Sequence, residues 1–121
     1  MKILIADDHP LFRAALSQAA RAAAVKCEVL EAEDLDAAIA TLERNEGVDL
    51  VLLDPPFDAQ QLVPPALAAA ARAVRAGGFV YLEASRRWEQ DALDALGLAL
   101  RRHLKAGAVH AHLLLRPVPG V

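Results

Sequence analysis

Short apolar runs alternate with stretches of helical periodicity along most of this chain, and this alternation limits the possible folds more than any other feature. It is typical of βαβ units and of a mostly parallel sheet. The run Leu50–Leu53 is apolar throughout, as expected for a strand covered on both faces. The pattern predicts strands over residues 2–6, 26–31, 49–53 and 79–84. It predicts helices beginning at Pro10, after an N-cap at Asp34, from Pro64 to about Arg75, and over residues 86–96.

The first predicted helix begins at Pro10, because proline is favoured in the first turn of a helix. Its apolar residues recur at helical spacing and predict the face that packs on the sheet. We expect that inner face to comprise Leu11, Phe12, Ala15, Leu16, Ala19 and Ala23.

The C-terminal part of the chain has a different pattern. Residues 98–104 and 108–115 both resemble strands, and the connection over residues 105–107 is so short that the two must pair antiparallel. We therefore expect one α/β domain over residues 1–121, a doubly wound, flavodoxin-like or Rossmann-like sheet. The expected strand order is 2-1-3-4-6-5, mostly parallel, with an antiparallel C-terminal hairpin.

Composition narrows the class of protein. Cys27 is the one cysteine, which excludes an internal disulfide framework and suits a reducing compartment. The apolar runs at residues 1–6 and 66–71 are too short for a membrane span, so we expect a cytoplasmic protein without a membrane partner. Residues 1–60 hold five Lys and Arg against twelve Asp and Glu, whereas residues 61–121 hold eight against four. The two halves therefore carry opposite net charge, −7 and +4.

Acidic residues follow three of the predicted strands at their carboxyl ends, where open parallel sheets carry their binding sites. Asp7 and Asp8 follow the first strand, Asp54 follows the third, and Glu83 lies near the end of the fourth. The first and third strands should be neighbours, so Asp7, Asp8 and Asp54 are expected to converge. Oxygen ligands of this kind favour Mg²⁺ over zinc. The alternative is that these residues are hydrated loop acids without a ligand.

The first half of the chain resembles the receiver domain of LuxR/NarL-type response regulators. The resemblance is carried by Lys2–Arg13, by Val29–Ala32 and by Asp49–Asp54. It implies phosphoryl transfer from a sensor kinase to Asp54 as phosphoacceptor, with Asp7 and Asp8 helping to hold Mg²⁺. Glu83 stands where a receiver has Thr or Ser.

From residue 54 onward the chain resembles the C-terminal half of RsmD-type ribosomal RNA (guanine-N2) methyltransferases, which use S-adenosylmethionine. The matching segments are Asp54-Pro55-Pro56-Phe57, residues 77–83 and the closing hairpin. The resemblance implies that Asp54, Pro55, Pro56 and Phe57 form a base-binding loop. In it Asp54 and Pro55 would contact the exocyclic amine of the target base, and Phe57 would stack on the base.

Neither resemblance brings a complete active site. A methyltransferase binds its cofactor on a glycine-rich turn after the first strand, and that turn here is Asp7-Asp8-His9-Pro10. We therefore expect no required cofactor, with Mg²⁺ as a possible ligand and S-adenosylmethionine disfavoured. Our leading hypothesis is a chimera, an engineered or recombined fold of residues 1–53 and 54–121 that is not an enzyme. The alternatives are a degenerate Mg²⁺-dependent receiver, or a methyltransferase remnant that still contacts ribosomal RNA or S-adenosylmethionine.

Three histidines are expected on the C-terminal hairpin. With a tip at Ala106-Gly107, His103 pairs with His110, and His112 lies on the same face. We interpret them as a solvent-facing polar stripe, with adventitious Zn²⁺ binding as the alternative. Cys27, Tyr81 and Trp88 are expected to be packing residues.

Overall fold

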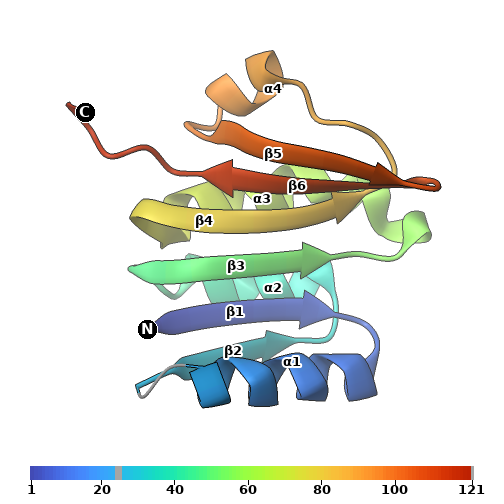
Figure 1. Ribbon diagram of the computed structural model, residues 1–121, viewed down its shortest axis with the longest axis vertical. Coiled ribbons are helices and arrows are strands. Elements are labelled where there is room, and N and C mark those ends of the chain that lie inside the picture. The colour runs from blue at the N-terminus through green and yellow to red at the C-terminus, as the bar shows by residue number, and fades with distance from the viewer. Residues whose placement is uncertain (24–25, 121) are drawn as a thin grey trace.

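The computed structural model describes residues 1–23 and 26–120, and its strands form one six-stranded sheet in the order β2-β1-β3-β4-β6-β5. β1 to β4 run parallel, β6 runs antiparallel to β4, and β5 runs antiparallel to β6 (Figure 1). The predicted fold class and strand order are therefore confirmed. In chain order the elements are β1 (Lys2–Asp7), α1 (Pro10–Ala23), β2 (Glu28–Ala32), α2 (Leu35–Glu43), β3 (Val48–Asp54), the 3-10 helix η1 (Phe57–Leu62), α3 (Val63–Ala73), β4 (Val74–Ala84), α4 (Gln90–Asp94), β5 (Ala99–Ala106) and β6 (Val109–Leu115).

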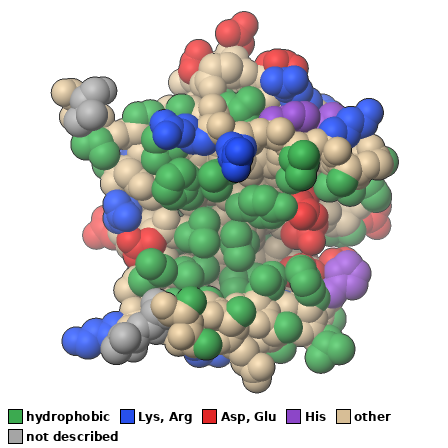
Figure 2. Space-filling model, viewed as in Figure 1, with side chains coloured by type: hydrophobic (Ala, Val, Ile, Leu, Met, Phe, Trp, Pro, Cys, Tyr) green, Lys and Arg blue, Asp and Glu red, His purple; other side chains and the backbone are tan. Residues whose placement is uncertain are grey.

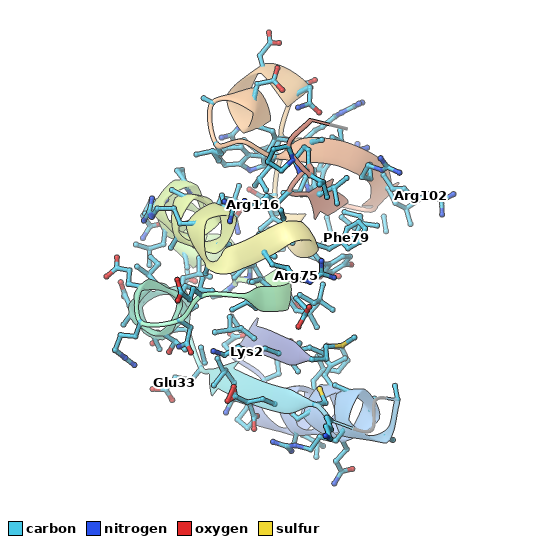
Figure 3. The ribbon with its side chains drawn as sticks, turned by 90° about the vertical axis from the view of Figure 1, so that its left-hand side faces the viewer. Lys2, Glu33, Arg75, Phe79, Arg102 and Arg116 are labelled. Atoms are coloured by element: carbon cyan, nitrogen blue, oxygen red, sulfur yellow. The ribbon has the colours of Figure 1, made fainter. Side chains whose placement is uncertain are left out.

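The core lies between one face of the sheet and the helices α2 and α3, which pack on each other. α3 is rich in alanine, and its small side chains allow the helix to approach the sheet closely. Alternate residues of β3 and β4 face this core, and Val51, Leu53, Val80 and Leu82 are fully buried there. Figure 3 shows the sheet nearly edge-on, with α2 and α3 on one side and α1 on the other.

The opposite face of the sheet, called here the front face, is covered by a helix only near β1 and β2 (Figure 1). Phe79 from β4 and Arg102 from β5 lie on the same side of the sheet as α1 (Figure 3). Over β3, β4 and β6 this face carries half-buried apolar side chains, namely Leu50, Leu52, Phe79, Tyr81, Leu113 and Leu115. Figure 2 shows hydrophobic side chains gathered across the middle of this face.

The predicted inner face of α1 is wrong for Leu11, Ala15, Ala19 and Ala23, which are exposed, whereas Leu16 is half-buried and lines a cavity over the sheet together with Phe12. Leu11 and Phe12 are 85% and 54% exposed, and the one buried residue of this helix is Ser17. The physical reason is Arg13, which donates to the Asp7 carbonyl oxygen at 2.6 Å and to Glu31 Oε1 at 3.2 Å. These two bonds turn the Arg13 side of the helix toward the sheet and leave much of the apolar stripe at the surface.

Several element boundaries also differ from the predictions. α3 ends at Ala73, and β4 begins at Val74 rather than at Phe79, with an irregular start that pairs with β3 through a register shift. Arg116 donates from Nη1 to the Val74 carbonyl oxygen at 2.5 Å and thereby holds this start in place. The fourth helix spans only Gln90–Asp94. Cys27 precedes β2 and is half-buried, so it is not part of a core strand.

No helix in the described part of the chain is both long and apolar enough to cross a membrane.

Candidate functional site at the carboxyl ends of β1, β3 and β4

Three carboxyl groups form a row across neighbouring strands. Asp7 of β1 lies opposite Asp54 of β3, and the pairing of Leu53 with Leu82 places Asp54 beside Glu83 of β4. The predicted convergence of Asp7 and Asp54 is what the structure shows, and Glu83 joins them. Asp8 lies in the following turn with its side chain partly exposed. The row gathers negative charge at one end of the front face, where Figure 2 shows acidic side chains at its right-hand end.

The row of Asp7, Asp54 and Glu83, called here the acid row, changes the protonation of Asp54, which lies in its middle. Burial raises the pKa of Asp54 to about 7, and the nearby charges of Glu83 and Asp7 act in the same direction. Asp7 is only 2% exposed, and its Oδ2 atom has no hydrogen-bond partner among the described residues. A proton on Asp54 relieves the repulsion between adjacent carboxylates. Asp54 is therefore the group of this row that changes charge near neutral pH.

Hydrogen bonds and close polar contacts within the chain hold the turn after β1. The His9 backbone N–H donates to Asp7 Oδ1 at 2.8 Å, and His9 Nδ1 lies 3.1 Å from Asp7 Oδ1 and 3.0 Å from Asp8 Oδ1. The hydrogen bond to Asp7 and the charges of Asp8 and Asp7 raise the pKa of His9. Asp7, Asp8 and His9 offer ligand atoms within 4.8 Å of one another, so they could hold a metal ion. Mg²⁺ binding by Asp7, Asp8 and Asp54 stays a prediction.

The loop after β3 is stiff and is tied to the loop after β4. Gln60 Nε2 donates to the Pro56 carbonyl oxygen at 3.2 Å. Gln60 Oε1 accepts from the Ser85 backbone N–H at 3.0 Å and from the Ser85 hydroxyl at 3.1 Å. Phe57 begins η1 and stays 60% exposed. An aromatic ring is thus presented to solvent on a fixed support.

A cavity of about 320 Å³ opens between these elements. Its lining joins the acidic residues to the stiff loop and includes Asp8, His9, Asp54, Phe57, Gln60 and Glu83. The structure therefore brings the predicted base-binding residues Asp54, Pro55, Pro56 and Phe57 to one cavity.

Sequence reasoning missed two residues at this site. Gln60 contacts both loops, but no signal in the sequence marks it. Tyr81 was expected only to pack, yet its hydroxyl donates to Glu83 Oε1 at 2.8 Å. Burial and this hydrogen bond raise the pKa of Tyr81 to about 12. The two-residue spacing of Tyr81 and Glu83 was the available signal, because it places both side chains on one face of a strand.

The interpretation of the hairpin histidines as a solvent-facing stripe is wrong for His112. Ala106 pairs with Val109, so the tip is Gly107-Ala108, and His103 lies opposite His112 rather than His110. His112 is fully buried: its Nε2 accepts from the Trp88 backbone N–H at 3.0 Å, and its Nδ1 lies 3.2 Å from the Leu82 carbonyl oxygen. Trp88 is buried, as expected for a packing residue.

Solved structures of methyltransferases share this fold. A proposed methylase from Haemophilus influenzae superposes with a TM-score of 0.59 at 15% identity, over 97% of this chain and 73% of that one. A proposed methyltransferase from Escherichia coli gives 0.59 at 18%, over 95% and 63%. Phosphoethanolamine N-methyltransferase 2 from Haemonchus contortus, solved with S-adenosyl-L-methionine, gives 0.61 at 15%, over 100% and 34%. At these identities the likeness concerns the fold.

The family follows from the sequence. The model of the family described as conserved hypothetical protein 95 matches residues 2–115, and the chain therefore belongs to that family. A curated relative, the glycerol metabolism activator of Pseudomonas putida, is 47% identical over 53 residues. That match covers 44% of this chain and about a quarter (24%) of the length of the relative.

The family match corrects the hypothesis of two joined halves. One family model spans residues 2–115, including all but the first residue of the segment 1–53 that we assigned to a receiver domain. The receiver domain and the chimera are therefore wrong, and so is an engineered or recombined fold without native activity. The expected roles of Asp54 as a phosphoacceptor and of a sensor kinase as a partner rested on the resemblance to a receiver domain. Without a receiver domain, these roles have no support.

The residues of the turn after β1 do not fit the cofactor that such methyltransferase folds bind. The described glycines lie at positions 47, 77, 78, 97, 107 and 120, outside this turn. The turn instead carries the carboxylates of Asp7 and Asp8, and the partly exposed Asp8 would repel the negative methionine carboxylate of S-adenosylmethionine. The His9 backbone N–H and the Arg13 guanidinium already bond to Asp7, through Oδ1 and the carbonyl oxygen respectively.

Proposed function

We propose that this chain is a methyltransferase-family domain that binds a guanine base of RNA in the cavity at the Asp54–Phe57 loop. The observation that carries the proposal is the pairing of an exposed aromatic ring, Phe57, with a half-buried carboxyl group, Asp54, in one cavity. Aromatic rings stack on bases, and carboxylates accept hydrogen bonds from base amines.

The chemistry of Asp54 favours guanine. An ionised carboxylate has two acceptor oxygens and no donor. The Watson–Crick edge of guanine carries two adjacent N–H donors, the ring N1–H and the exocyclic amine, so it matches a carboxylate with two hydrogen bonds. The same edge of adenine offers one donor beside an acceptor. Asp54 therefore selects guanine when it is ionised.

Basic side chains lie close in sequence to Ala84 and Val109, two residues that line the cavity, and they support this proposal. Arg86 and Arg87 follow Ser85 in the loop that Gln60 ties to the cavity, and Lys105 lies near the tip of the β5–β6 hairpin. All three are exposed. The Arg86 guanidinium lies 4.2 Å from the centre of the Trp88 ring, which supports its position. Exposed Arg and Lys side chains of this kind contact phosphates without reading sequence.

Fluorescence anisotropy with a labelled single-stranded RNA tests this proposal. One RNA carries a single guanine within an adenine tract, and the other has adenine throughout. We expect the guanine-containing RNA to bind more tightly, and Phe57→Ala to weaken its binding by about fivefold or more, since stacking of one base contributes about 1–3 kcal/mol. Asp54→Asn is expected to remove the preference for guanine.

Leu11→Ala is the control, because Leu11 is an exposed large apolar residue on α1 that, in the described part of the chain, lines no cavity containing Asp54. Equal affinity of the Phe57→Ala variant and the wild type would refute the stacking role. A guanine preference that survives Asp54→Asn would refute the role of the carboxylate.

A further inference from the structure

Two histidine side chains outside the acid row approach each other at the C-terminal hairpin. His103 Nε2 and His110 Nδ1 lie 2.8 Å apart, and their ring centroids are 5.0 Å apart with an angle of 25° between the planes. The rings come from β5 and β6, which are joined by the two-residue tip Gly107-Ala108. The antiparallel ladder holds both backbones in register, so the two nitrogens are positioned before any ligand arrives.

The third histidine of this face is committed elsewhere. His112 is buried, and its two ring nitrogens are engaged by the Trp88 N–H and by the Leu82 carbonyl oxygen. Its ring centroid lies 5.2 Å from that of His103, but its nitrogens are not free for a ligand. A site at this hairpin therefore has two imidazole ligands from the protein rather than three.

The geometry points to a copper(II) site formed by His103 and His110, and we propose that these two residues bind Cu²⁺ through Nε2 and Nδ1 respectively. Imidazole nitrogen suits zinc, copper and nickel rather than Mg²⁺. With metal–nitrogen distances of about 2.0 Å, two nitrogens at neighbouring corners of a square lie about 2.8 Å apart, whereas tetrahedral corners need about 3.3 Å. The observed 2.8 Å is the length of the hydrogen bond that joins the metal-free pair, and it equals the nitrogen spacing that the square arrangement of Cu²⁺ requires.

The protonation of the pair is compatible with metal binding. Burial lowers the pKa of His103, and the charges of Arg87 and His110 act in the same direction, so its neutral form prevails at neutral pH. In the neutral pair one ring donates its N–H to the other. When the metal binds, that proton moves to the outer nitrogen of the same ring, and both facing nitrogens present lone pairs. Arg87 opposes a cation here, and Glu89, whose effect is smaller, favours one.

Titration of the full chain with Cu²⁺ alone, followed by calorimetry and by electron paramagnetic resonance, tests the site. We expect one strongly bound ion with a signal from two nitrogen ligands. His103→Gln and His110→Gln should each weaken binding at least tenfold, and Zn²⁺ should bind at least tenfold more weakly than Cu²⁺. His9→Gln is the matched control, because His9 belongs to the separate group with Asp7 and Asp8. That variant should bind within twofold of the wild type.

Loss of binding in His9→Gln, with His103→Gln unchanged, would assign the ion to the β1–α1 turn and overturn the proposal. Zn²⁺ binding as tightly as Cu²⁺ would overturn the square geometry. If the variants do not fold, proton NMR of the wild-type protein tests the site instead. Substoichiometric Cu²⁺ should broaden the imidazole proton signals of His103 and His110 first, and broadening of His9 before them would contradict the site. The outcome is independent of RNA binding, which uses other residues.

Discussion

At the scale of single residues, Asp54 combines two properties that oppose each other. It is the carboxyl group that the proposed function needs in its ionised form, and it lies between Asp7 and Glu83, which disfavour that form. The same arrangement therefore provides an acceptor for a base amine and costs the folded protein stability above neutral pH. RNA binding by the wild type should for this reason strengthen as the pH rises through about 7.

Asp54→Asn is expected to stabilise the protein above neutral pH. The pKa of Asp54 rises from 3.8 to about 7 on folding, so the folded state holds a proton that the unfolded state has lost. Wild-type stability therefore falls as the pH rises from about 4 to about 7. We expect the variant to be more stable than the wild type by roughly 1 kcal/mol at pH 8.5, after allowance for the partial exposure of the group. Urea unfolding at pH 4.5 and 8.5 measures this, and an advantage that does not grow with pH would contradict it.

The relative positions of two residues could be predicted from sequence where they depend only on the direction in which neighbouring strands run. Parallel neighbours bring their carboxyl ends together, so Asp7 and Asp54 could be placed side by side from sequence. The pairing of His103 could not, because moving a hairpin tip by one residue changes every cross-strand partner by two. Apolar spacing also misplaced the inner face of α1, because it carries no information about Arg13, whose charged group bonds back to Asp7 and Glu31.

At the scale of elements, the start of β4 is the least regular part of the sheet. Val48 pairs with Val74, and Leu50 pairs with Phe79, so β4 has several extra residues at this point. The sequence predicted the regular part of the strand from Phe79 onward. It did not predict the irregular start, because the pair Gly77-Gly78 is typical of a helix end as well as of a bulge. The backbone of Gly77 donates to the Arg116 carbonyl oxygen at 2.7 Å, a contact distant in sequence.

Gly78→Ala is expected to destabilise the fold through this bulge. A Cβ atom at Gly78 would lie 2.7 Å from Val74 Cγ2 and 2.9 Å from the Asp49 carbonyl oxygen, and the backbone oxygen cannot move aside easily. We expect a loss of about 2–3 kcal/mol in the free energy of unfolding. Gly107→Ala at the hairpin tip is the control: its φ of +60° disfavours alanine, but nothing lies within 4 Å, so the cost should be roughly 1 kcal/mol. A larger loss at Gly107 would show that crowding at the bulge is unimportant.

At the scale of the whole molecule, the two faces of the sheet are unequally covered. The face under α2 and α3 holds the core, and the front face over β3, β4 and β6 holds half-buried apolar side chains (Figure 2). The sequence pattern predicted the strand order correctly, but the assignment of the two halves to two different families was wrong. Local motifs at each end suggested two families, whereas the family model weighs residues 2–115 together and finds one.

Neighbouring leucines of β6 should reveal this asymmetry. Leu114 is fully buried and Leu113, on the opposite face, is half-buried. We expect Leu114→Ala to lower the free energy of unfolding by about 3 kcal/mol and Leu113→Ala by about 1 kcal/mol or less. Denaturant unfolding of the two variants gives the comparison. Equal losses would mean that the front face is as well packed as the core.

The short β5–β6 hairpin has a consequence for the order of folding. Its strands meet across two residues, so it can form within about 1–10 μs without help from the rest of the chain. β1 instead needs β3, with Leu4 opposite Val51, and the chain between them must first be brought back on itself. The middle of the sheet should therefore assemble after its C-terminal margin, and the acid row, which spans β1, β3 and β4, should be among the last features to form.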